Sequence, residues 1–123
     1  MLGYVTLGTN DIEKAAAFYD RVCAEFGVGR MMESDSFIAW GKPGGGAGIG
    51  LTKPFDGQPA SVGNGVMAAF QADSKEQVDK VYKLAVEELG ATCEGPAGPR
   101  GDTFYAGYFR DPDGNKLNVF TMG

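Results

Sequence analysis

Few residue types in this 123-residue chain could carry out chemistry. The chain has no histidine, which excludes a Ser-His or Cys-His nucleophile pair, an imidazole base and an imidazole metal ligand. Its two cysteines, Cys23 and Cys93, do not have the spacing of a metal-binding motif. Because neither has a neighbouring histidine to generate a reactive thiolate, we expect both to be packing residues.

Arg100 is the clearest candidate for binding an anion. It lies in a segment of glycine and proline, residues 95–101, and could bind an anionic substrate bidentately if this segment covers a cleft. The competing interpretation is an exposed loop arginine without a ligand. Aromatic residues near the ends of predicted strands could line the same cleft or belong to the core: Trp40, Phe104, Tyr105 and Tyr108.

Charge and composition exclude several classes of partner. The formal net charge is −5, whereas a nucleic-acid-binding face is basic, so no nucleic-acid partner is expected. We find no signal peptide and no apolar run of membrane length, and we expect a cytoplasmic protein with no membrane partner. The glycine-rich residues 41–50 lack both phosphate-loop motifs and join two predicted strands, so they indicate a hairpin turn.

The first half of the chain predicts one helix among four strands. Asn10 is the expected N-cap with Glu13 three residues later, apolar residues recur at helical spacing from Ile12 to Phe26, and Gly27 ends the helix. Strands are predicted at residues 1–8, 30–33, 36–41 and 46–52. Residues 53–65 are rich in turn formers and predict a connector.

The second half repeats this order. Ser74 and Gln77 form a capping box at the start of a helix that Gly90 ends. Strands are predicted at residues 66–72, 91–94, 104–110 and 116–121, with a tight turn at 111–115 between the last two. Strand alternation places Lys116, Asn118 and Phe120 on one face.

Both halves therefore have the pattern βαβββ, and a duplication of about 60 residues is a strong architectural signal. We predict an α+β fold of two tandem βαβββ modules that form a curved, cleft-bearing mixed sheet with helices on the outer face. A single domain is expected over residues 1–123, with module one at about 1–55 and module two at about 64–123.

Three segments, LGYVTLGTNDIEKAAAFYD, KPFDGQPASVGNG and FYAGYFRDPDGNKLNVF, together resemble the glyoxalase/bleomycin-resistance/extradiol-dioxygenase (vicinal oxygen chelate) superfamily. The resemblance spans nearly the whole chain. It implies a cleft between the modules and, in metal-dependent members, His, Gln or Glu ligands at four inward-facing strand positions. These positions fall here on Tyr4, Gly50, Met67 and Asn118, which offer no anionic ligand at neutral pH. We therefore expect no metal and no cofactor.

The resemblance also suggests which residues face a ligand. Tyr4, Met67 and Asn118 either line a ligand cleft or simply refill a vacated metal site, and strand parity carries Thr6 and Ala69 inward with them, leaving Val5, Leu7, Ala68 and Phe70 to the helices. No catalytic residue is assigned. The expected ligand-binding cleft consists of Tyr4, Thr6, Trp40, Gly50, Met67, Ala69, Arg100, Tyr105 and Asn118.

Three functions remain open from the sequence. The first is a metal-independent glyoxalase/bleomycin-resistance-like protein, a homodimer that binds a small organic molecule in the sheet cleft. The second is a lyase or isomerase, similar to lactoylglutathione lyase, acting on a small oxygenated or glutathione-conjugated substrate, with tyrosines and Arg100 replacing the electrostatic role of a metal. The third is a structural or regulatory module with an unused cleft.

Overall fold

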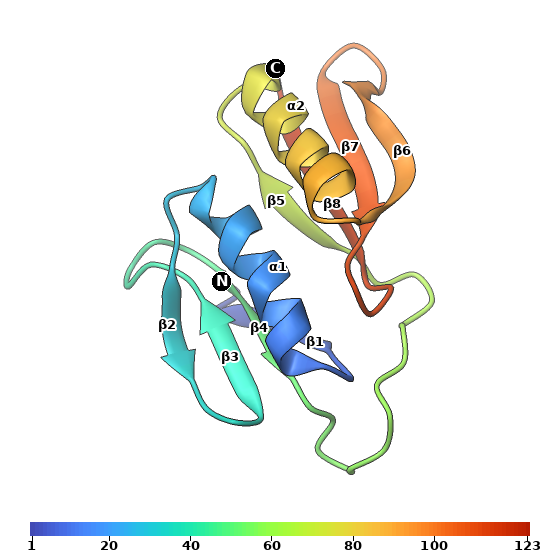
Figure 1. Ribbon diagram of the computed structural model, residues 1–123. Coiled ribbons are helices and arrows are strands. Elements are labelled where there is room, and N and C mark those ends of the chain that lie inside the picture. The colour runs from blue at the N-terminus through green and yellow to red at the C-terminus, as the bar shows by residue number, and fades with distance from the viewer. The chain divides into compact units, whose positions relative to one another are not determined.

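The computed structural model describes residues 1–123 and contains two four-stranded mixed sheets (Figure 1). The chain divides into two compact units, Met1–Gly63 and Asn64–Gly123, which are described separately. Their strand orders, β1-β4-β3-β2 and β5-β8-β7-β6, are the same pattern repeated. The predicted α+β fold of two tandem βαβββ modules is confirmed. A single domain with a cleft stays a prediction.

The first unit consists of β1 (Tyr4–Gly8), α1 (Ile12–Ala24), β2 (Arg30–Glu33), β3 (Phe37–Trp40) and β4 (Gly48–Thr52). Strand β1 pairs with β4 in parallel, and the other pairs are antiparallel. Because side chains alternate along a strand, each sheet has one face toward its helix and one helix-free face. The helix side of this sheet carries the buried Leu7, Ile38, Trp40, Ile49 and Leu51.

The N-cap of helix α1 lies one residue later than predicted. Asp11 is the N-cap and accepts a hydrogen bond from the backbone N–H of Lys14 at 3.2 Å, so the predicted Asn10 cap is wrong. Asn10 instead pairs with the backbone of Ala60: its amide donates to the Ala60 carbonyl at 3.2 Å and accepts from the Ala60 N–H at 2.7 Å. A side-chain amide can pair in this way because it has the donor and acceptor of a peptide group.

The second unit consists of β5 (Ala68–Gln71), α2 (Lys75–Lys83), the π-helix η1 (Leu84–Glu88), β6 (Thr92–Pro99), β7 (Phe104–Arg110) and β8 (Lys116–Met122). Ser74 accepts from the N–H of Gln77 at 3.1 Å, as predicted, while Gln77 reaches back to the N–H of Asp73. Strand β6 extends five residues beyond its predicted end at 94, with register shifts on both sides of Gly95.

The turn between β7 and β8 forms as predicted. The Asp111 carboxylate, only 5% exposed, accepts from the backbone N–H groups of Asp113 and Asn115 and from the Asn115 amide, at 2.9 to 3.0 Å. Gly114 has φ +90°, a conformation that glycine adopts without a steric penalty.

Residues 53–65 contain neither helix nor strand, as predicted for a connector. Neither α1 nor α2 has the length and apolar character of a membrane-spanning helix.

Candidate functional site

The helix-free face of the first sheet carries Tyr4, Thr6 and Gly50, together with Phe37. Thr6 pairs with Gly50, and the rings of Tyr4 and Phe37 meet edge to face with centroids 6.1 Å apart. A Cβ at Gly50 would lie 2.9 Å from Cε1 of Phe37, so the ring occupies the space that a side chain would need. Tyr4 remains 61% exposed. This face is therefore aromatic and accessible, with no side-chain ligand at residue 50.

Trp40 lies on the other side of the same sheet. It is 1% exposed, packs against Tyr19 with ring centroids 5.6 Å apart, and donates its indole N–H to Asp20 at 2.9 Å. Its neighbour Ala39 pairs with Gly50, so strand alternation directs Trp40 toward α1. Trp40 therefore belongs to the core and does not line the helix-free face.

On the helix-free face of the second sheet, the side chains of β7 and β8 are charged at the end near the turn and apolar at the opposite end. Four cross-strand pairs follow one another on it: Arg110 with Lys116, Tyr108 with Asn118, Ala106 with Phe120, and Phe104 with Met122. Ala69 of β5 pairs with Asn118 and lies on the same face, whereas Met67, 41% exposed, directly precedes the strand. A molecule on this face would meet cations at one end and aromatic rings at the other.

Asn118 is the most unusual side chain of this face. It is 2% exposed, and its buried Oδ1 has no hydrogen-bond partner. Buried polar atoms are nearly always paired, and leaving one unpaired costs about 1–3 kcal/mol. The position therefore needs a donor, which a water molecule or the N–H or O–H of a bound molecule can supply.

Tyr105, also expected in the cleft, points to the helix side of the second sheet. Its hydroxyl donates to Asp79 of α2 at 2.7 Å, and this hydrogen bond raises the pKa of Tyr105. It is one residue away from the Ala106–Phe120 pair and therefore on the opposite face from Asn118. Tyr105, like Trp40, therefore does not line the helix-free face of its sheet.

Arg100, in contrast, lies over the face of Asn118. Its guanidinium carbon is 5.5 Å from the ring centroid of Tyr108, the cross-strand partner of Asn118. The amine of Lys116 is 5.6 Å from the same centroid. The sequence reasoning missed Lys116 as a site residue, although the alternation that it applied to Asn118 already placed Lys116 on the same face.

The two cysteines have no role in this arrangement. Cys23 is buried in α1, and burial, assisted by the nearby Asp20 carboxylate, raises the pKa of its thiol to about 12. Cys93 of β6 accepts a hydrogen bond from the Tyr82 hydroxyl at 2.9 Å, and this bond raises the pKa of Tyr82 to about 12. Cys93 lies on the helix side of its sheet, because it pairs with the buried Phe109.

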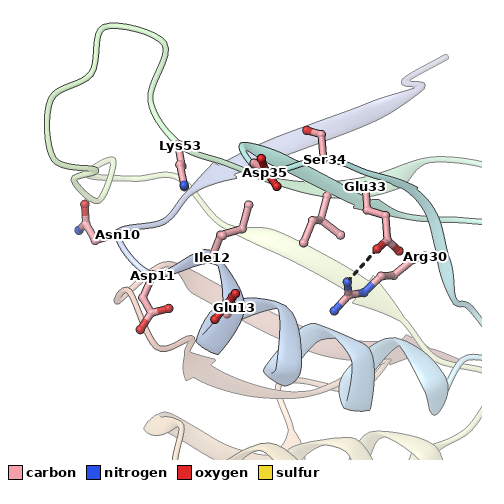
Figure 2. A pocket seen from close by; sticks show the side chains of 10 residues that line it. Asn10, Asp11, Ile12, Glu13, Arg30, Glu33, Ser34, Asp35 and Lys53 are labelled. Atoms are coloured by element: carbon pink, nitrogen blue, oxygen red, sulfur yellow. Dashed lines mark ion pairs between the residues drawn. The ribbon is translucent and has the colours of Figure 1, made fainter.

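A polar groove of about 810 Å³ lies at the start of α1, on the helix side of the first sheet (Figure 2). Its main cation, Arg30, is already paired with Asp20 and Glu33. In Figure 2 the carboxylates of Asp11, Glu13 and Asp35 and the amine of Lys53 lie apart from one another around this groove. The lining residues are Asn10, Asp11, Ile12, Glu13, Arg30, Glu33, Ser34, Asp35, Ile38 and Lys53.

The metal that the fold implies does not fit the residues present. Gly50 has no side chain, Asn118 is a neutral amide, and neither Tyr4 nor Met67 is a usual ligand of a divalent ion at neutral pH. Elsewhere, no three His, Cys, Asp or Glu side chains are grouped so that they could hold a metal ion. The donor set is suited to hydrogen bonding and apolar contact with an organic molecule.

Comparison with known proteins agrees with this architecture. A family model described as the Glyoxalase/Bleomycin resistance protein/Dioxygenase superfamily matches residues 1–119. The crystal structure of a glyoxalase/bleomycin resistance protein from Albidiferax ferrireducens T118 is 36% identical, with a TM-score of 0.90 over 100% of this chain and 99% of that one. No curated protein matches.

Two more distant structures share the fold. A glyoxalase/bleomycin resistance protein/dioxygenase family enzyme from Burkholderia phytofirmans PsJN is 23% identical, with a TM-score of 0.77 and 98% of each chain covered. A lactoylglutathione lyase from Agrobacterium tumefaciens is 24% identical, with a TM-score of 0.73 over 98% of this chain and 92% of that one.

Proposed function

Because this chain belongs to the glyoxalase/bleomycin resistance protein/dioxygenase superfamily, we propose that it binds a small organic molecule on the helix-free face of its second sheet, without a divalent metal. The observation that carries the proposal is the buried, unpartnered Oδ1 of Asn118. The residue occupies the position at which the family resemblance expects a glutamate ligand. A neutral amide there replaces a metal contact with a hydrogen-bond acceptor for a ligand.

The surroundings of Asn118 support an organic ligand. Tyr108 lies opposite it, and the stacked rings of Phe104 and Phe120, with centroids 5.3 Å apart, continue the same face. Sites for small molecules combine apolar and aromatic surface with a few placed polar groups. Described by itself, the helix-free face of the first sheet also carries an aromatic pair, Tyr4 and Phe37.

A lyase or isomerase reaction is the second candidate, and the cations near Tyr108 favour it to a limited extent. Arg100 could stabilise negative charge that develops on a substrate oxygen. A glyoxalase-like proton transfer, however, also needs a base, and Asn118 cannot accept a proton as a carboxylate does. Binding therefore has better support than catalysis.

Native mass spectrometry of freshly purified protein tests the proposal. We expect the wild type to carry an organic adduct, or to acquire one from a mixture of small aromatic compounds, with no stoichiometric divalent metal by elemental analysis. Asn118→Leu should abolish the adduct without unfolding the protein, because it replaces an amide whose buried Oδ1 is unpaired with an apolar group of similar size.

The matched control is Thr121→Val on the same strand. Thr121 pairs with Tyr105 on the helix side, so this change removes a polar atom without touching the Asn118 face. Equal adduct formation by wild type and Asn118→Leu would refute the binding role of this face. About one zinc, nickel, iron or manganese per chain would refute metal independence.

A further inference from the structure

The guanidinium of Arg100 is held by the backbone of its own segment. Nη1 donates to the carbonyls of Gly98 and Pro99 at 3.1 and 3.3 Å, and Nη2 donates to the carbonyl of Pro96 at 2.7 Å. Arg100 therefore has a defined position although the side chain is exposed. A guanidinium has five N–H donors, so Nε and one N–H of Nη2 are still available to another acceptor.

The absence of a side chain at Gly95 leaves space for the guanidinium of Arg100. A Cβ at Gly95 would lie 3.1 Å from Nη2 of Arg100 and 3.4 Å from Cδ1 of Tyr108. The absence of a side chain thus lets the guanidinium approach both strand β6 and the ring of Tyr108. Preorganisation of this kind lowers the entropic cost of ligand binding, because the arginine does not have to be ordered when the ligand arrives.

Two cations on this face have no acidic partner. Arg100 bonds only to carbonyls, and Lys116 approaches the Tyr108 ring without forming an ion pair. The third cation of the face, Arg110, is neutralised by Glu94 at 2.8 Å. In a chain whose net charge is −5, an unpaired arginine and lysine around one ring form a local positive site.

We propose that Arg100 and Lys116 form an oxyanion subsite beside Asn118, and that the ligand of this face is a small organic acid. This inference rests on the proposed function and specifies its ligand class. The acid group, a carboxylate or a phosphate-type group, binds the free donors of Arg100 and the amine of Lys116. A rotation of the Asn118 side chain exposes its buried Oδ1 to a hydroxyl or N–H close to the acid group, and the apolar body lies toward Phe120 and Phe104.

Titration of ¹⁵N-labelled protein with mandelate tests the subsite by NMR. Mandelate combines a carboxylate, an adjacent hydroxyl and an aromatic ring, mandelamide is its neutral counterpart, and phenylacetate lacks the hydroxyl. We expect mandelate to shift the backbone amides of Tyr108, Lys116 and Asn118, with mandelamide and phenylacetate binding more weakly. Raising the salt concentration should weaken mandelate binding because the contact is ionic.

Three substitutions test whether Arg100 and Lys116 bind the acid group of mandelate. Arg100→Gln and Lys116→Gln should each weaken mandelate binding about tenfold, the loss of one charge-assisted contact. Gly95→Ala should weaken it too, because the new methyl group displaces the guanidinium. The control is Lys75→Gln: Lys75 lies 5.7 Å from the Tyr105 ring, a similar cation and ring pair on the helix side, and its removal should leave binding unchanged.

The outcomes separate this inference from the function on which it rests. Equal binding of mandelate and mandelamide, or Arg100→Gln and Lys116→Gln variants that bind like wild type, would overturn the oxyanion subsite and leave organic-ligand binding intact. Binding of inorganic phosphate with no shift for any organic acid would overturn the assigned ligand class. If no mandelate binding occurs while Asn118→Leu still abolishes a native adduct, the subsite falls and the proposed function stands.

Discussion

The indole nitrogen of Trp40 donates a hydrogen bond to Oδ1 of Asp20 at 2.9 Å, which joins the core of the first sheet to the polar side of α1. Arg30 donates to both oxygens of the same carboxylate, at 2.9 and 2.8 Å. Asp20 therefore pairs a buried donor and positions a cation at the sheet edge. This arrangement explains why Trp40 is unavailable to a ligand.

We expect Asp20→Ala to lower the free energy of unfolding by about 1–3 kcal/mol, because the buried indole N–H loses its acceptor. In a Trp40→Phe background the donor is absent, so the same substitution should cost less. Urea unfolding of the four proteins of this double-mutant cycle gives the coupling between the two residues. Additive effects would contradict the role assigned to the hydrogen bond.

The lowered pKa of Asp20 predicts that the stability of the folded protein depends on pH. The hydrogen bond from Arg30 is the main reason that the pKa of Asp20 lies below its usual 3.8 in the folded protein. A carboxyl with a lowered pKa stabilises the fold fully above its unfolded pKa, and this contribution disappears as the pH falls through the folded pKa. The stability difference between wild type and Asp20→Asn should therefore be constant from pH 5 to 7 and shrink below about pH 4. A difference independent of pH, measured by urea unfolding at each pH, would contradict this.

Asp111→Ala should destabilise the protein by about 2 kcal/mol or more, since it removes three hydrogen bonds from a buried turn. Asp102→Ala, at an exposed position between β6 and β7, serves as the control and should change stability by less than about 0.5 kcal/mol. Thermal unfolding followed by circular dichroism measures both. Equal effects would show that the carboxylate does not stabilise the turn.

Gly107→Ala should be destabilising by about 1–3 kcal/mol, because the new Cβ would lie 2.9 Å from Cδ1 and 3.2 Å from Cβ of Tyr82. Tyr82 belongs to α2, so relief of the clash would require the helix to move from the sheet. Gly98→Ala is the comparison, since its nearest contact would be an ordinary 3.5 Å. Denaturant unfolding in which both variants matched wild type would show that the sheet and helix adjust freely.

A homodimer is expected from exposed edge strands. Met31 and Met32 of the edge strand β2 are 53% and 59% exposed, and strand edges with apolar side chains tend to be covered by a second copy. Light scattering coupled to size exclusion at micromolar concentration measures the mass directly. A mass of 12.9 kDa would show a monomer and contradict the expectation.

The sequence predicted the repeated fold and several local details, because these depend on residues close together in the chain. The turn at Asp111, the Ser74 cap and the bounds of β2 and β7 were predicted from local turn, cap and strand patterns. The Asn10 cap failed because its competing partner, Ala60, is fifty residues away and only the fold brings it close. No local signal predicted the π-helix η1.

The residues of the candidate site were predicted less well from the sequence than the fold. Strand alternation correctly grouped Lys116 with Asn118, yet Trp40 and Tyr105 were assigned by their aromatic character and lie on the helix sides. The position of Arg100 depends on carbonyls of its own irregular segment and on the empty space at Gly95. Neither the unpaired Oδ1 of Asn118 nor the missing counter-ions of Arg100 and Lys116 can be seen in a sequence, because both are properties of tertiary neighbours.

The pairing of Asn10 with Ala60 lowers the conformational entropy cost of ordering the connector. In the sequence, the connector runs from Lys53, but the two hydrogen bonds to Ala60 fasten its first part to the start of α1. The part of the connector between this contact and the start of β5 is the short stretch from Ser61 to Met67. Each halving of a loop's length lowers its closure entropy cost by about 0.6 kcal/mol, so a side-chain amide that divides the connector lowers the entropy cost of ordering each part.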